Sequence, residues 1–204
     1  MLFDIGANRG LYTAANETRY ERVVLIEPQQ ALVASLERRY VAPKFTVERC
    51  IVSNEKNVPF FVNRLADTIS TASVDWVHDS RFTDTHNNWQ EVKDIPTITI
   101  DALVVKYGVP SYMKIDVEGY EEQVLRSMTR KYCDLAFEWA EESQASILRS
   151  IALLQQLGYQ QFHLHNEDEY TYIPDNFVDG TEVIKQIQQL NPKRRERWGM
   201  LYCR

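Results

Sequence analysis

The chain has 204 residues, of which 44% are hydrophobic and 25% are charged, a composition that is typical of a globular domain and excludes a fibrous or disordered chain. The formal net charge of −6 argues against general nucleic-acid binding and a polybasic membrane anchor, because phosphate groups repel negative charge, and leaves open only a local basic patch. No apolar stretch is long enough to span a membrane. Three cysteines without a leader sequence indicate a reducing, cytoplasmic location.

The first 52 residues alternate between short apolar runs and amphipathic stretches. Residues 2–5 and 23–26 are mainly apolar runs, which are typical of strands buried on both faces. Helical spacing follows each run, at 11–20 and 29–40, and residues 44–52 form a third candidate strand. This β-α-β-α-β order predicts right-handed crossovers and a parallel sheet.

The remainder of the chain continues this pattern around one irregular segment. We predict strands at 59–62, 112–117, 133–139, 161–165 and 199–203, and helices at 100–107, 120–128 and 141–157. Residues 64–95 are polar and have no clear period, and such a stretch inside a compact domain is usually functional. We expect one domain over residues 1–204, with 64–95 as a loop or lid. Its aromatic rings either line a binding site or pin the loop: Trp76, His78, Phe82, His86 and Trp89.

A glycine-rich turn, residues 4–10, separates the first strand from the first helix. Gly6 and Gly10 allow a tight turn and a close approach to a ligand, and the helix that follows offers free N–H groups. Asp4 would meet a cation or ordered water at the strand end, or brace the turn. A dinucleotide fingerprint would need glycine where this chain has Asn8 and Leu11, and no P-loop motif occurs. The alternative is a plain turn without a ligand.

Glu27 ends the second strand, about twenty residues beyond the glycine turn. A carboxylate in this position accepts hydrogen bonds from the ribose hydroxyls of a nucleoside cofactor. The alternative role is to stabilise the next helix through its dipole. Because the glycine turn precedes it, we favour the ribose.

Charged residues also lie at the carboxyl end of the strand at 112–117. Lys114, Asp116 and Glu118 share one side of an extended strand, and they are costly to bury without partners. Ligands of open α/β sheets bind outside the carboxyl ends of the strands, so Asp116 faces Gly6 there if the two strands are neighbours. The alternative is an internal ion-pair network that holds the turn. Glu138, at the end of the next strand, could join this rim.

Two further patterns are weak. His163 and His165 share a strand face beside an acidic turn, but two ligands are poor evidence for a metal site. The basic run Lys193, Arg194, Arg195 and Arg197 suits an acidic substrate, although a solvated connection is the simpler interpretation.

Together, the glycine turn, Glu27 and the run Lys-Ile-Asp-Val-Glu-Gly at 114–119 resemble the FkbM family of class I S-adenosylmethionine-dependent methyltransferases. Residues 25–28, 53–56, 70–73 and 98–103 also resemble segments of that family, so the similarity covers residues 2 to about 140. The resemblance implies an α/β fold with three layers and a doubly wound, Rossmann-like, mostly parallel sheet of seven strands. It also implies methyl transfer, usually to a hydroxyl oxygen of a sugar or natural product.

The resemblance assigns candidate residues to each part of that reaction. The cofactor, S-adenosylmethionine, would bind Asp4, Gly6, Ala7, Asn8, Gly10, Glu27, Pro28, Cys50 and Ile51. Lys114, Asp116 and Glu118 are the catalytic candidates, because a hydroxyl acceptor needs a base or a divalent metal to lose its proton. Residues 64–95 would cover a small-molecule or glycan acceptor.

Two alternatives stay open. One is a nucleoside-binding module without turnover, since relatives usually carry a helix before the first strand. The other is an NAD-linked oxidoreductase, which Asn8 and Leu11 disfavour.

Overall fold

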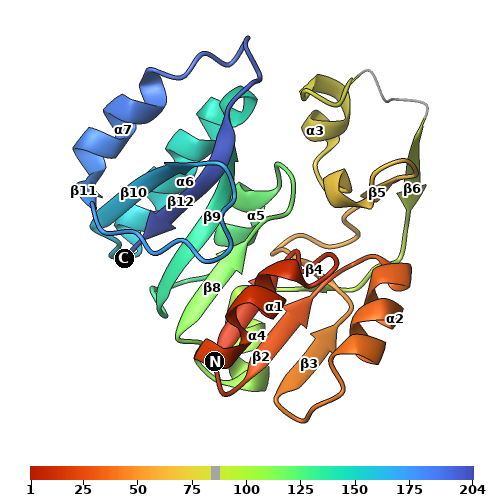
Figure 1. The fold of residues 1–204 in the computed structure, drawn as a ribbon. Helices are drawn as coiled ribbons and strands as arrows, with labels where there is room; N and C mark the ends of the chain where they lie inside the picture. The colour runs from red at the N-terminus through yellow and green to blue at the C-terminus, as the bar shows by residue number, and fades with distance from the viewer. Residues whose placement is uncertain (84–87) are drawn as a thin grey trace.

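The computed structural model describes residues 1–83 and 88–204 and is built on a central eight-stranded sheet (Figure 1). Its strands are β1 (Leu2–Ile5), β2 (Val23–Ile26), β3 (Phe45–Glu48), β8 (Tyr112–Ile115), β9 (Asp134–Ala140), β10 (Gln161–Asn166), β11 (Val178–Asp179) and β12 (Trp198–Cys203). They lie in the order β11-β10-β12-β9-β8-β1-β2-β3. The predicted doubly wound α/β fold is confirmed, and the strand beyond the expected seven is the two-residue edge strand β11.

The five strands from β3 to β9 are parallel, and β12 runs antiparallel to both of its neighbours. Leu2 pairs with Val23 on one side and Tyr112 on the other, so β1 lies between β2 and β8. Every residue of β1 and β2 is buried, as expected for strands covered on both faces. This order brings the carboxyl ends of β2, β1, β8 and β9 to one edge.

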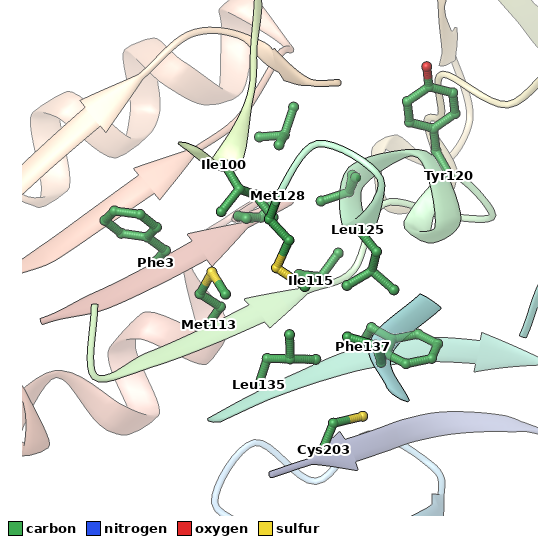
Figure 2. Packing of buried hydrophobic residues seen from close by; sticks show 14 of the residues in the cluster. Phe3, Ile100, Met113, Ile115, Tyr120, Leu125, Met128, Leu135, Phe137 and Cys203 are labelled. Atoms are coloured by element: carbon green, nitrogen blue, oxygen red, sulfur yellow. The ribbon is translucent and has the colours of Figure 1, made fainter. Parts of the chain in front are cut away.

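Helices and two hydrophobic clusters cover the two faces of the sheet. The helices are α1 (Leu11–Asn16), α2 (Gln30–Arg39), α4 (Ile100–Tyr107), α5 (Glu121–Leu125), α6 (Gln144–Gln156) and α7 (Gly180–Gln188). One cluster joins α4–α7 to alternate strand residues, and Figure 2 shows its centre, including Phe3, Met113, Leu125, Met128 and Leu135. The other cluster packs Leu36 of α2 against Leu2 and Leu25 on the opposite face. The predicted three layers are therefore present.

The segment between β3 and α4 is more ordered than its sequence suggests. The predicted strand at 44–52 is interrupted, because β4 (Ile51–Val52) leaves the main sheet and pairs with β7 (Thr97–Ile98). Residues predicted as an irregular loop include α3 (Val74–Asp79) and β6 (Trp89–Val92), which pairs with β5 (Phe60–Asn63). Ser73 caps α3 by accepting a hydrogen bond from the Trp76 N–H at 3.1 Å.

Short 3-10 helices complete the described chain: η1 (Glu17–Arg19), η2 (Asp67–Ile69) and η4 (Glu141–Ser143). Among the helices in the two described ranges, none has the length and apolar character that crossing a bilayer requires.

Candidate active site

A cavity of about 580 Å³ opens where β1, β2, β8 and β9 end, at the edge where ligands of such sheets bind. Ten of the predicted site residues line it: Gly6, Ala7, Asn8, Glu27, Pro28, Cys50, Ile51, Lys114, Asp116 and Glu118. Asp4 and Gly10 do not line the cavity and lie behind its wall. Residues that are far apart in the sequence therefore meet, because the sheet order makes their strands neighbours.

Glycine is required at position 6 by the neighbouring strand. Gly6 has a φ of 76°, and a Cβ there would lie 1.7 Å from the carbonyl oxygen of Asp116. The N–H groups of Gly6 and Ala7 both donate to the Ile26 carbonyl at 3.0 Å. The turn is thus held between β2 and β8, with its backbone on the cavity wall.

Asp4 and Lys114 form a buried polar pair behind this turn. Asp4 is 0% exposed and accepts a hydrogen bond from the Thr13 hydroxyl at 2.6 Å. The Lys114 ammonium lies 3.0 Å from the Asp116 carboxylate and 3.7 Å from that of Asp4, and it donates to the Gly6 carbonyl at 3.0 Å. Burial favours the neutral amine, but the two carboxylates outweigh it and raise the pKa of Lys114. Asp4 is therefore placed to brace the turn.

Glu27 is 2% exposed and closes one end of the cavity. Its two carboxylate oxygens accept hydrogen bonds from the backbone N–H groups of Asn8, at 2.8 Å, and Gln29, at 2.9 Å. Burial raises the pKa of Glu27 to about 7, although these N–H groups oppose the rise. Each oxygen keeps a lone pair that a ligand hydroxyl can use.

Three acids form the acid cluster at the other end: Asp116, Glu118 and Glu138, each of which has one carboxylate oxygen within 4.8 Å of an oxygen of the other two. Glu118 has a φ of 57°, a left-handed conformation that is strained for a residue with a side chain. Burial, followed by the charges of neighbouring acids, raises the pKa values of Glu118 and Glu138. Such a cluster has the chemistry of a proton acceptor, and three carboxylates are also ligands that divalent cations prefer.

The 64–95 segment contacts both ends of the site. Asp67 accepts hydrogen bonds through its carbonyl from the side chains of Asn8, at 3.3 Å, and Gln29, at 3.1 Å, and pairs with Arg9. Trp76, Arg81 and Phe82 line the cavity further along. The segment therefore does not cover the acceptor side alone, since its first residues hold the glycine turn.

The remaining candidates lie elsewhere. His163 is bonded to the Asn176 carbonyl and the Tyr172 hydroxyl, both at 2.7 Å, and His165 stacks on Tyr172. Arg195 pairs with Asp79, so the basic run ties the C-terminal connection to α3. His78 and Trp89 do not line the cavity, and His86 lies outside the described residues.

Sequence reasoning missed several lining residues that come from distant segments: Gln29, Arg81, Asp168, Tyr170 and Trp198. Asp168 and Tyr170 belong to a strap, residues 167–177, that follows β10. Its residues Tyr172 and Phe177 pack against Ala136, Met200 and Tyr202, on the sheet face opposite α6. The acidic turn after His165 was the one visible signal for this strap.

The chain is similar to known proteins in family and in fold. The family model described as the methyltransferase FkbM domain matches residues 4–161. The structure of methyltransferase FkbM from Methylobacillus flagellatus KT is similar, with a TM-score of 0.51 and 17% identity over 100% of this chain and 43% of that chain. This likeness shows a shared fold, and the present chain spans less than half the length of that protein.

Two other solved structures are more distantly similar. Precorrin 8w decarboxylase from Methanobacterium thermoautotrophicum has a TM-score of 0.47 and 11% identity, covering 99% of this chain and 79% of that chain. A SAM-dependent methyltransferase from Archaeoglobus fulgidus has a TM-score of 0.39 and 10% identity, covering 100% and 85%. No curated protein matches the chain.

Proposed function

The chain belongs to the FkbM methyltransferase family, and from this membership and the cavity we propose that it transfers the methyl group of S-adenosylmethionine to a hydroxyl oxygen of a sugar or natural-product-like acceptor. One observation carries the proposal: a single cavity has a buried carboxylate, Glu27, at one end and the acid cluster at the other. Glu27 and Glu138 belong to strands three steps apart in the sheet, which corresponds to about 14 Å at the usual strand spacing. This separation is long enough for a nucleoside bound at Glu27 and a reacting group beside the acid cluster.

The residues present fit this cofactor. Gly6, Ala7 and Asn8 line the cavity together with Glu27, which offers lone pairs for two ribose hydroxyls. Cys50 and Ile51, buried in the cavity wall, supply apolar surface for a flat base. When bound, the cofactor supplies an electrophilic methyl group on a sulfonium.

The acid cluster would then handle the proton of the acceptor. Asp116 or Glu118 would accept the proton that the acceptor hydroxyl loses, while the sulfonium that supplies the methyl group would become a neutral thioether. The raised pKa of Glu118 suits this role, since a general base works best near the working pH. Lys114 keeps Asp116 oriented through their 3.0 Å ion pair. A divalent cation held by the cluster would be the alternative means of acidifying the hydroxyl.

Isothermal titration calorimetry with S-adenosylhomocysteine, S-adenosylmethionine and NAD tests the proposal, followed by mass spectrometry of hydroxylated acceptors. We expect both sulfur compounds to bind, NAD not to bind, and an acceptor to gain one methyl group. Binding of NAD without the sulfur compounds would favour an oxidoreductase. Tight cofactor binding with no methyl transfer to any acceptor would favour a binding module.

A further inference from the structure

Glu118 belongs to a turn, residues 117–119, that lies between β8 and α5. Glu118 and Gly119 both have positive φ angles, of 57° and 83°. Glycine adopts this left-handed conformation freely, whereas a residue with a side chain is strained in it. Such a conformation persists only where neighbouring groups hold it. The contacts of this turn therefore determine where the Glu118 carboxylate lies.

Two buried side chains hold the turn through its backbone. The Glu121 carboxylate accepts hydrogen bonds from the N–H groups of Val117, at 3.0 Å, and Gly119, at 3.2 Å. The Thr71 hydroxyl donates a hydrogen bond to the Glu118 carbonyl at 2.7 Å. Glu121 thus holds N–H groups of the turn, while Thr71 holds the carbonyl between its two left-handed residues.

Thr71 is itself fixed by three hydrogen bonds. Its backbone N–H and carbonyl pair with the carbonyl and N–H of Phe61 in β5, at 2.9 and 2.7 Å. Its hydroxyl oxygen also accepts a hydrogen bond from the Ser73 N–H at 2.8 Å. Thr71 is 0% exposed and does not line the cavity. It can therefore influence a bound ligand only through the turn that it holds.

The segment that carries Thr71 also contacts the proposed cofactor end of the cavity. The Asp67 carbonyl accepts a hydrogen bond from the Gln29 side chain at 3.1 Å, and the Ser70 hydroxyl donates to the oxygen of that side chain at 3.3 Å. Gln29 lines the cavity, as does Glu27. Because Thr71 follows Ser70 directly, one short segment contacts both ends of the site.

The ionisation of Glu118 depends on where this turn places it. Burial raises the pKa of the Glu118 carboxyl, and the charges of Asp116 and Glu121 raise it further. Without the Thr71 hydroxyl, the Glu118 carbonyl loses this donor, and rotation of its peptide group would carry the carboxylate out of the acid cluster toward water. The pKa of Glu118 would then fall toward the ordinary value of 4.5.

We propose that Thr71 is a positioning residue: its hydroxyl holds the peptide group of Glu118 in the left-handed conformation that keeps the Glu118 carboxylate in the acid cluster, beside the acceptor. The effect on turnover rests on the proposed methyl transfer. The placement of Glu118 does not, because the titration of its carboxyl can be measured without turnover.

NMR titration of protein labelled with ¹³C at the glutamate side-chain carboxyls tests the placement, and Glu118→Gln identifies the Glu118 signal. Thr71→Val keeps the shape of the side chain and removes the donor, whereas Thr71→Ser keeps the hydroxyl. We expect the titration midpoint of Glu118 to fall by about one pH unit in Thr71→Val. It should stay at the wild-type value in Thr71→Ser.

Methyl transfer by the same variants tests the consequence for the reaction. In Thr71→Val, kcat should fall by about 10–10²-fold, as for a misplaced catalytic group, while S-adenosylhomocysteine affinity stays unchanged. The acidic limb of the kcat profile should move to lower pH together with the Glu118 midpoint. Thr71→Ser should restore both kcat and the profile, which a loss of packing alone would not explain.

Thr99→Val is the matched control. The Thr99 hydroxyl also accepts a backbone hydrogen bond, from the Ala102 N–H at 3.0 Å, but it caps α4 and does not line the cavity. This variant should keep the Glu118 midpoint and kcat. If Thr71→Val does not fold, Thr71→Ala and Thr71→Ser make the same comparison, since they differ only by the hydroxyl.

Two results would overturn the inference. One is an equal Glu118 midpoint in the wild type and in the variant that lacks the hydroxyl, and the other is a Thr71→Ser variant that behaves like Thr71→Val. A midpoint that shifts as expected, in a protein that binds no S-adenosylhomocysteine and methylates no acceptor, would support the placement and instead contradict the proposed function.

Discussion

Glu27 lines the cavity, and its two carboxylate oxygens accept hydrogen bonds from the backbone N–H groups of Asn8 and Gln29. Glu27→Ala removes the proposed ribose acceptor and also frees both N–H groups. We expect cofactor binding to weaken by roughly 1.5–3 kcal/mol, as measured by calorimetry. Glu37→Ala, an exposed residue on α2 with the same charge change, is the control. Unchanged affinity of the Glu27 variant would contradict the ribose assignment.

Asp116 is proposed as a base and is also the ion-pair partner of Lys114. A test of the first role must therefore leave Lys114 with other partners. Asp116→Asn keeps the shape and removes the charge, while Lys114 retains Asp4 and the Gly6 carbonyl as partners. If the carboxylate takes the acceptor proton, kcat should fall by about 10²–10⁴-fold, with a much smaller change in cofactor affinity. A chelator added to the wild-type enzyme tests the metal alternative. A fully active variant, with activity insensitive to chelator, would leave Asp116 as a structural partner of Lys114.

The chain segment directly after α3 is anchored by the side chain of Arg81. The Arg81 guanidinium donates two hydrogen bonds to Glu142, whose side chain is 4% exposed, and a third to the Arg197 carbonyl. Arg81→Met leaves a buried carboxylate without its partner, so the free energy of unfolding should fall by about 3–5 kcal/mol. Acceptor KM should rise as well, because Phe82 and Trp76 lose their anchor, while cofactor affinity changes little.

Urea denaturation of a set of variants measures how much the Arg81–Glu142 ion pair contributes to the free energy of unfolding. Arg81→Met with Glu142→Leu should recover most of the lost stability, since no buried charge remains. Lys185→Met removes one side of an exposed pair, whose side chains are 61% and 48% exposed, and should change stability by no more than about 1 kcal/mol. A single Arg81 variant as stable as the wild type would show that the pair does not hold the segment.

Elements with a strong local pattern could be predicted, and elements held by distant contacts could not. The apolar runs of β1 and β2 and the spacing of α2 and α4 predicted the parallel half of the sheet. In contrast, α3 is six residues long, and its end is held by Arg81 and Arg195, which reach partners 61 and 116 residues away. No local period encodes such contacts. The break after Glu48 was missed for a similar reason, because β4 leaves the main sheet and pairs with β7, about 45 residues further along the chain.

At the scale of the whole molecule, strand order decides which predicted residues meet. The sequence indicated that Gly6, Glu27 and Asp116 each end a strand, and the observed neighbours β2, β1 and β8 bring all three to one cavity. Asp168 and Trp198 were not predicted because they enter from β10 and β12, whose antiparallel pairing folds the C-terminal part back toward β9. The cavity residues that end the parallel strands were therefore more predictable than those that enter from the C-terminal part of the chain.

Two sets of carboxyl groups determine how the stability of the molecule depends on pH. Burial raises the pKa values of Glu27 and Glu121 to about 7. Their stabilisation is fully present below the unfolded pKa of 4.5 and is lost as the pH rises through about 7. In Glu122 and Glu142 burial acts in the same direction, but hydrogen bonds from arginines outweigh it and lower the pKa. Their stabilisation is present above 4.5 and is lost as the pH falls.

The free energy of unfolding should therefore be greatest near about pH 5 and decrease toward about pH 8. A single carboxyl shifted as far as that of Glu27 accounts for about 3 kcal/mol of this decrease. Urea denaturation across that range measures it, and Glu27→Gln should flatten the decrease because the amide does not titrate. Glu37→Gln, on the exposed face of α2, should leave the profile unchanged. An unfolding free energy that rises from about pH 5 to about pH 8 would mean that the carboxyls at the cavity stay ionised in the folded protein.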